Sequence, residues 1–184
     1  RRFSDFATFP EALEYAARGE RGLNFHDPRG NLTQVYPYAE LQGDAQAAAY
    51  RLVADGVRKG DRIALVAQTG PEFAALFCGA ILAGALPVPL PLPTSFGGKD
   101  GYIDQLAVQL QSCDPTVLLF PAEIGAMAQA AAAKQGCAAE SFESFYAREA
   151  SACSLPEAHA DDICYLQYSS GSTRFPHGVA VTHG

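Results

Sequence analysis

The fold is decided by residues 62–90, which have the sequence RIALVAQTGPEFAALFCGAILAGALPVPL. Arg62 to Ala67 predicts a buried strand, because every residue after Arg62 is apolar. Pro71 to Ala83 predicts a helix, because proline stands at its first position and Gly84 follows its end. Leu86 to Leu90 predicts a second strand. This order predicts two parallel strands joined by a right-handed crossover.

The same alternation continues further along the chain. Tyr102 to Ser112 predicts another helix, and Pro115 to Phe120 predicts a third strand. The strand segments Ile63–Val66 and Val117–Phe120 are apolar at every position, as in a sheet that is covered on both faces. We therefore expect an α/β fold, with a mostly parallel sheet and βαβ crossovers flanked by helices. Further helices are expected at Pro10–Arg18, Tyr38–Ala54, Glu123–Gln135 and Phe142–Ala150, and a hairpin at Leu23–Asp27 and Thr33–Tyr36.

The turn after the first strand of this pattern argues against a dinucleotide-binding site. Gln68 to Glu72 contains a single glycine, and a proline follows it directly. The Rossmann fingerprint needs three glycines, for the turn, for the approach of the pyrophosphate and for helix packing. That class of nucleotide site is therefore excluded.

The composition is that of a globular domain. The chain has 184 residues, of which 48% are apolar and 18% charged, so one domain with a sizeable core is expected. The net charge of −7 and the lack of a basic run exclude nucleic acid as the main partner. Phe73 to Pro93 has no charged residue and about the length of a membrane span, but four prolines interrupt it. We expect no membrane span.

Cysteine usage indicates a reducing compartment. The five cysteines are odd in number and irregularly spaced, with no C-x-x-C pair. Neither a disulfide framework nor a cysteine metal site is indicated. No charged-then-apolar leader is visible at the start, so the cytoplasm is the expected location.

Residues 165–179 have the sequence YLQYSSGSTRFPHGV, which places a hydroxyl-rich turn between two apolar segments. Hydroxyl groups donate hydrogen bonds, and the backbone amides of such a turn form a concavity that accepts anions. Gly171 lets the backbone come close to a ligand. The spacing is not that of a Walker loop. A plain polar hairpin is the alternative, but the apolar flanks favour a phosphate site. Its candidate residues are Ser169, Ser170, Gly171, Ser172, Thr173 and Arg174.

This stretch resembles the phosphate-binding signature of the AMP-forming adenylating enzymes, roughly [TS]-[SG]-G-[ST]-T-G-x-P-K-G-V. That superfamily contains acyl-CoA synthetases, peptide-synthetase adenylation domains and luciferases. Leu166-Gln167-Tyr168 before the turn and Arg174 within it are most similar to the fatty acyl-AMP ligases. The other resembling segments are Tyr38–Leu41, Gly60–Leu65 and Gly84–Pro89.

The resemblance implies that a fatty acid and ATP react to give an acyl-adenylate and pyrophosphate. ATP and Mg²⁺ would be required, and the acyl group would pass to an acyl carrier protein. By motif position, residues 169–173 should contact the β- and γ-phosphates, with Mg²⁺ bridging these groups. Such contacts position the substrate and stabilise charge on the leaving group. No catalytic acid, base or nucleophile is implied in this segment, and the residues that bind the metal are unknown.

Two positions depart from the signature. Arg174 stands where the family usually has glycine, and His177 where it has lysine. A histidine is mostly neutral at pH 7, whereas an arginine stays charged and presents a fork of donors that suits phosphate. The hypothesis is that Arg174 supplies the cationic contact that His177 has lost. The alternative is that Arg174 is a loop charge facing solvent.

The resemblance covers residues 1–184 as the N-terminal part of an AMP-binding domain. In the family the adenine pocket, the acyl tunnel and the C-terminal lysine lie beyond the position of Gly184. The remainder of the large domain and the C-terminal domain are therefore expected downstream, and the isolated chain is expected to be inactive. Two alternatives stay open: a fatty acyl-CoA synthetase, and a non-catalytic ligand-binding or assembly module on the same fold.

Overall fold

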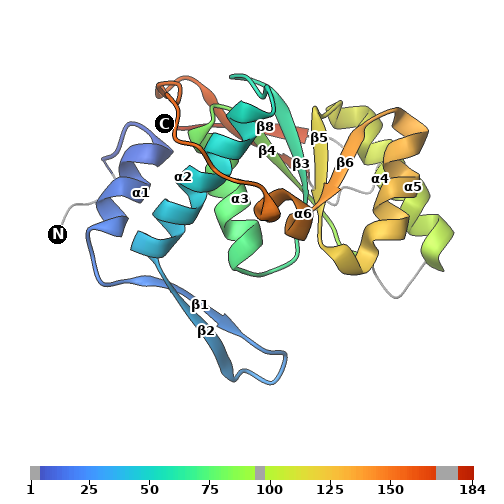
Figure 1. Cartoon of the computed structure of the whole chain (residues 1–184), viewed down its shortest axis with the longest axis horizontal. Coiled ribbons are helices and arrows are strands. Elements are labelled where there is room, and N and C mark those ends of the chain that lie inside the picture. The colour runs from blue at the N-terminus through green and yellow to red at the C-terminus, as the bar shows by residue number, and fades with distance from the viewer. Residues whose placement is uncertain (1–4, 94–97, 169–177) are drawn as a thin grey trace.

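A four-stranded parallel sheet forms the centre of the protein in the computed structural model, which describes residues 5–93, 98–168 and 178–184. The strand order is β4-β3-β5-β6, and every neighbouring pair is parallel. The strands are β3 (Arg62–Val66), β4 (Leu86–Leu90), β5 (Val117–Phe120) and β6 (Ala138–Ser141). This sheet confirms the predicted α/β fold and its parallel crossovers (Figure 1).

Helices cover both faces of the sheet, as the apolar strands require. Ala64 and Val66 belong to the core under α4 (Gly98–Cys113) and α5 (Gly125–Gln135). Their neighbours Ile63 and Leu65 point to the other face, under α2 (Tyr38–Ala54) and α3 (Pro71–Leu82). Figure 1 shows the two helix pairs on opposite sides of the strands. The successive side chains of one strand thus build two separate cores.

The N-terminal segment packs against the α2–α3 side. Helix α1 (Phe9–Ala17) is followed by an antiparallel hairpin of β1 (Gly22–His26) and β2 (Leu32–Pro37), as predicted. Leu13 of α1 and Tyr36 of β2 are buried in a third core with residues of α2 and α3. The remaining elements are the 3₁₀ turn η1 (Ala122–Ile124), α6 (Phe142–Ala147), β7 (Ile163–Tyr168) and β8 (Gly178–Thr182).

The largest departures from the predicted elements are one missed strand and two misplaced helix ends. Strand β6 was missed, because the four residues Ala138–Ser141 carry no strand pattern of their own and are held by pairing with β5. Helix α6 ends at Ala147 instead of Ala150, because Arg148 turns into extended backbone and pairs with Asp55 and Glu140. Helix α4 begins at Gly98, four residues before the predicted start.

The apolar segment from Phe73 to Pro93 forms the rest of α3 and then strand β4, as the sequence predicts. Both elements are largely buried inside the domain. Across the described parts of the chain, no helix has the length and apolar character that a membrane crossing requires.

Candidate functional site

The predicted phosphate-binding segment connects two strands that are paired with each other. Ser169, Ser170, Gly171, Ser172, Thr173 and Arg174 lie outside the described residues, as does His177. The segment leaves β7 after Tyr168 and enters β8 at Gly178. These two residues face each other in the antiparallel register, so both ends of the segment are held at adjacent positions.

Packing against the main sheet fixes the position of β7. Leu166 and Tyr168 pack on the core formed by β4 and α4, and Cys164 is buried. The ring of Tyr165 meets Phe77 of α3 edge-on, with ring centroids 5.6 Å apart. Neighbouring residues of the strand thus reach two different helices, because successive side chains of a strand point to opposite faces.

Burial also settles the chemistry of the cysteines beside this frame. It raises the pKa of the Cys164 thiol to about 11 and that of Cys78 to about 12. A thiol of this kind stays protonated at neutral pH and is a poor nucleophile. Both residues are therefore small core residues.

Polar contacts anchor the other end of the hairpin. The Lys59 ammonium donates to Asp162 Oδ2 at 2.6 Å, and the backbone N–H of His159 donates to the same oxygen at 2.8 Å. The Lys59 hydrogen bond, foremost, holds the pKa of the Asp162 carboxyl below its usual value. The N–H of His183 donates to the Asp162 carbonyl. The turn before β7 is thereby tied to the end of β8.

His183 extends this anchor to the first helix. The backbone N–H of Phe9, at the start of α1, donates to His183 Nδ1 at 3.1 Å. Nδ1 accepts only when it carries no proton. Burial lowers the pKa of His183, an effect that the charge of Asp162 opposes and that of Lys59 reinforces. The neutral imidazole is therefore the form that the folded chain favours.

A pH dependence of stability follows from this contact. Because the folded pKa lies below 6.5, the stabilisation is complete above that value and is lost as the pH falls through the folded pKa. We expect the chain to lose less than about 1 kcal/mol of stability through this contact between about pH 8 and about pH 5, because solvent screens a partly exposed imidazole. In His183→Asn the amide oxygen offers an acceptor that does not titrate, so this part of the loss should disappear.

Thermal unfolding of both proteins across that pH range measures the effect. His26→Asn is the control, since His26 is exposed on β1. Parallel pH profiles for the native chain and His183→Asn would contradict the assignment.

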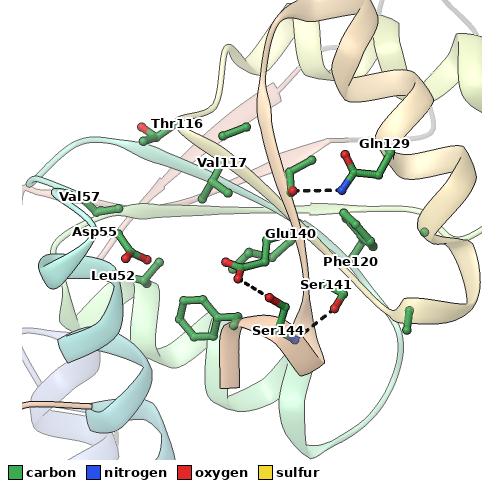
Figure 2. A pocket seen from close by; sticks show the side chains of 16 residues that line it. Leu52, Asp55, Val57, Thr116, Val117, Phe120, Gln129, Glu140, Ser141 and Ser144 are labelled. Atoms are coloured by element: carbon green, nitrogen blue, oxygen red, sulfur yellow. Dashed lines mark hydrogen bonds between the residues drawn. The ribbon is translucent and has the colours of Figure 1, made fainter. Parts of the chain in front are cut away.

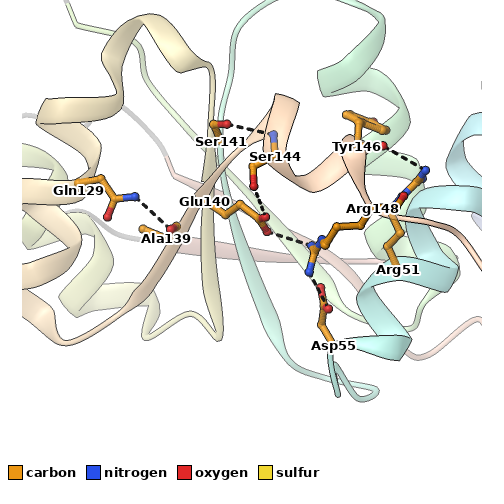
Figure 3. Close-up of polar contacts among 9 residues, drawn as sticks. All are labelled: Arg51, Asp55, Gln129, Ala139, Glu140, Ser141, Ser144, Tyr146 and Arg148. Atoms are coloured by element: carbon orange, nitrogen blue, oxygen red, sulfur yellow. Dashed lines mark hydrogen bonds and ion pairs between the residues drawn. The ribbon is translucent and has the colours of Figure 1, made fainter.

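A hollow of about 730 Å³ lies beside the edge strand β6 (Figure 2). Its lining is mainly apolar, with Leu52, Val117 and Phe120 among the side chains. Its two carboxylates, Asp55 and Glu140, are engaged by the Arg148 guanidinium at 2.8 and 2.9 Å (Figure 3). This cation is therefore already paired, and the hollow is a poor site for phosphate.

The contacts in Figure 3 instead fix the shape of this edge. Ser144 Oγ donates to Glu140 at 2.7 Å, and the Ser141 side chain caps the start of α6. The Gln129 side chain donates to the Ala139 carbonyl of β6 at 3.2 Å. Arg148 stands at the end of α6 and also lies over the Phe145 ring. Together these contacts join the edge strand β6 to α2, α5 and α6.

A second hollow of about 530 Å³ is lined by acidic groups. Asp44 accepts a 2.7 Å hydrogen bond from Tyr36, whose pKa burial raises. Further carboxylates come from Glu72, Glu123 and Glu143. A lining of this charge repels a polyphosphate. This acidic hollow is therefore also a poor site for the phosphates of a nucleotide.

The described residues also limit how a metal could be held. They contain no group of three or more His, Cys, Asp or Glu side chains that is placed for a metal ion. Hydroxyl groups such as those of residues 169–173 suit phosphate oxygens and, through these, a magnesium ion.

Known proteins resemble nearly the whole length of this chain. A family model described as AMP-binding enzyme matches residues 17–184. The chain is 42% identical over 189 residues to a putative acyl-CoA synthetase of Caulobacter vibrioides, covering 99% of this chain and 32% of that protein. It is 30% identical over 182 residues to the long-chain-fatty-acid–AMP ligase FadD32 of Mycolicibacterium smegmatis, covering 89% of this chain and 26% of that protein.

A solved structure gives the same relationship in three dimensions. It comes from structural and functional studies of fatty acyl-adenylate ligases from E. coli and L. pneumophila, and it superposes with a TM-score of 0.92 at 38% identity. The match covers 99% of this chain and 33% of that one. The chain thus spans about a third of the length of the proteins that it matches.

Proposed function

The chain belongs to the AMP-binding enzyme family, and from that premise we propose that it is part of a fatty acyl-AMP ligase. The reaction is the activation of a fatty acid carboxylate by ATP, which gives an acyl-adenylate and pyrophosphate. An acyl carrier protein then takes the acyl group. The proposal is supported by relatives that are named fatty-acid–AMP ligase or fatty acyl-adenylate ligase.

The observation that carries the proposal is the paired frame around the hydroxyl-rich segment. Strands β7 and β8 hold its two ends in register, and packing against β4 and α4 fixes β7. Ser169, Ser170, Gly171, Ser172 and Thr173 are proposed to contact the β- and γ-phosphates, with Arg174 as the cationic partner. When the carboxylate attacks the α-phosphorus, negative charge grows on the departing pyrophosphate, and fixed donors stabilise it.

We further propose that residues 1–184 are the N-terminal part of the adenylation domain. The chain matches only 26–33% of the length of these relatives. In this proposal residues 169–173 hold the nucleotide, and none of them acts as an acid, a base or a nucleophile in the reaction. The rest of the large domain and a C-terminal domain would then supply the other contacts.

A second candidate within the same chemistry is a fatty acyl-CoA synthetase. It is favoured by the relative at 42% identity, which is named a putative acyl-CoA synthetase. Both candidates form the same acyl-adenylate and differ only in the thiol that accepts the acyl group. Coenzyme A and a carrier protein offered in separate reactions distinguish them.

The test is pyrophosphate release from ATP by the full-length protein with a fatty acid and Mg²⁺. We expect release that requires the fatty acid, followed by acyl transfer to a carrier protein. The 184-residue chain alone should release none, because it supplies only the phosphate contacts. Fatty acid-dependent release by that chain would contradict the proposed division of the domain. A full-length protein that binds ATP without turnover would instead favour a non-catalytic module on this fold.

A further inference from the structure

We propose that Tyr168 is a positioning residue that fixes the phosphate-binding segment through Ser112 and Gly178. This inference rests on the proposed function, because it takes residues 169–173 as the phosphate contacts. Tyr168 itself is not proposed to touch the nucleotide. Its effect on ATP use comes from where it holds the two ends of the segment.

The first contact joins the hairpin to the main domain. The Tyr168 hydroxyl donates to Ser112 Oγ, 3.0 Å away, near the end of α4. Most of the packing of β7 is apolar and allows small shifts, whereas a hydrogen bond sets both a distance and a direction. A tyrosine hydroxyl keeps its proton at neutral pH, and burial raises the pKa of Tyr168 further, so this group remains able to donate.

The second contact closes the hairpin at the point where the segment starts and ends. Tyr168, the last residue of β7, is paired with Gly178, the first residue of β8. A Cβ atom placed on Gly178 would stand 3.2 Å from Tyr168 Cζ and 3.5 Å from both Cε atoms. The ring therefore lies over the glycine, the arrangement in which an aromatic side chain covers a glycine on the neighbouring strand.

These contacts act on opposite ends of one segment. The residue after Tyr168 is Ser169 and the residue before Gly178 is His177. The ring fixes the separation of the two ends, and the hydroxyl fixes their place relative to α4. A shift of the hairpin would displace Tyr168 and Gly178, the two ends between which the segment runs, and small misplacements of binding groups are costly. This is why a residue outside the segment can control the use of ATP.

Tyr168→Phe removes the donor of the hydrogen bond between Tyr168 and Ser112, and Ser112→Ala removes its acceptor. In the full-length protein we expect each to raise KM for ATP about 3- to 10-fold. The KM for the fatty acid should stay unchanged, and the double variant should be no worse than either single variant. Tyr102→Phe is the matched control: its hydroxyl also donates over 3.0 Å from α4, but to the Pro91 carbonyl after β4. It should leave KM for ATP unchanged.

The outcomes separate the inference from the proposed function. In one outcome, Tyr168→Phe and Ser112→Ala lower the melting temperature and leave KM for ATP unchanged, whereas Thr173→Ala raises KM for ATP. Tyr168 would then be only structural, and the inference would be wrong. If Thr173→Ala and Ser172→Ala also leave ATP use unchanged, the proposed function fails and the inference fails with it. A rise in KM that is shared by Tyr102→Phe would equally overturn the inference.

Discussion

Arg174→Ala is expected to reduce kcat/KM for ATP by about 10- to 100-fold in the full-length protein, whereas His177→Ala should have a small effect. The reason is charge: a hydrogen bond from a guanidinium to phosphate contributes about 1.5–3 kcal/mol. A neutral imidazole contributes less, and most histidine is neutral at pH 7. Steady-state kinetics with varied ATP at saturating fatty acid measures the difference.

Two further variants sharpen this prediction. Arg174→Lys keeps the charge but loses the planar fork of donors. Its kcat/KM for ATP should therefore lie between the values of the native protein and of Arg174→Ala. His177→Lys restores the lysine of the family signature and should recover part of the activity in the Arg174→Ala background. Equal losses from Arg174→Ala and His177→Ala would contradict the idea that one cation has replaced the other.

Gly79→Ala is expected to lower the free energy of unfolding by about 1–3 kcal/mol. Gly79 lies on α3, where that helix meets α2 most closely. An added Cβ would stand 2.7 Å from Ala48 Cβ and 2.8 Å from the Ala45 carbonyl oxygen. The second atom belongs to the backbone, so no side chain can turn aside and the two helices must separate. Urea denaturation followed by circular dichroism measures the loss.

Gly43→Ala is the matched control for this substitution. Gly43 lies on the exposed side of α2, and a Cβ there would have no heavy atom within 4 Å. Alanine is the better helix former, so this variant should gain about 0.5–1 kcal/mol. If both substitutions stabilise the protein, the α2–α3 contact is looser than the structure indicates.

Elements with a strong pattern of their own were predicted from sequence. Strand β5 and residues Ile63–Val66 of strand β3 are apolar at every position, and α2 begins and ends where its pattern does. Strand β6 was not predicted, because its stability comes from β5 and from the Gln129 contact, which lie elsewhere in the sequence. Pairing with a distant partner leaves no local signal in four residues.

The candidate site shows the same limit. The hydroxyl-rich segment could be recognised from residue types alone, since the chemistry lies in the side chains themselves. Its anchors could not, because Tyr168 meets Ser112 across 56 positions of sequence and Phe9 meets His183 across 174. In the sequence Gly178 is only one position of the signature. The structure gives a physical reason for glycine there, because the Tyr168 ring lies over it.

The most direct test of this account is a crystal structure of the full-length protein with ATP and Mg²⁺. We predict that the β- and γ-phosphates lie against residues 169–173, with the Arg174 guanidinium within hydrogen-bonding distance and Tyr168 still bonded to Ser112. Polyphosphate bound at another place, with the hydroxyl groups of this segment making no contact to it, would contradict the account.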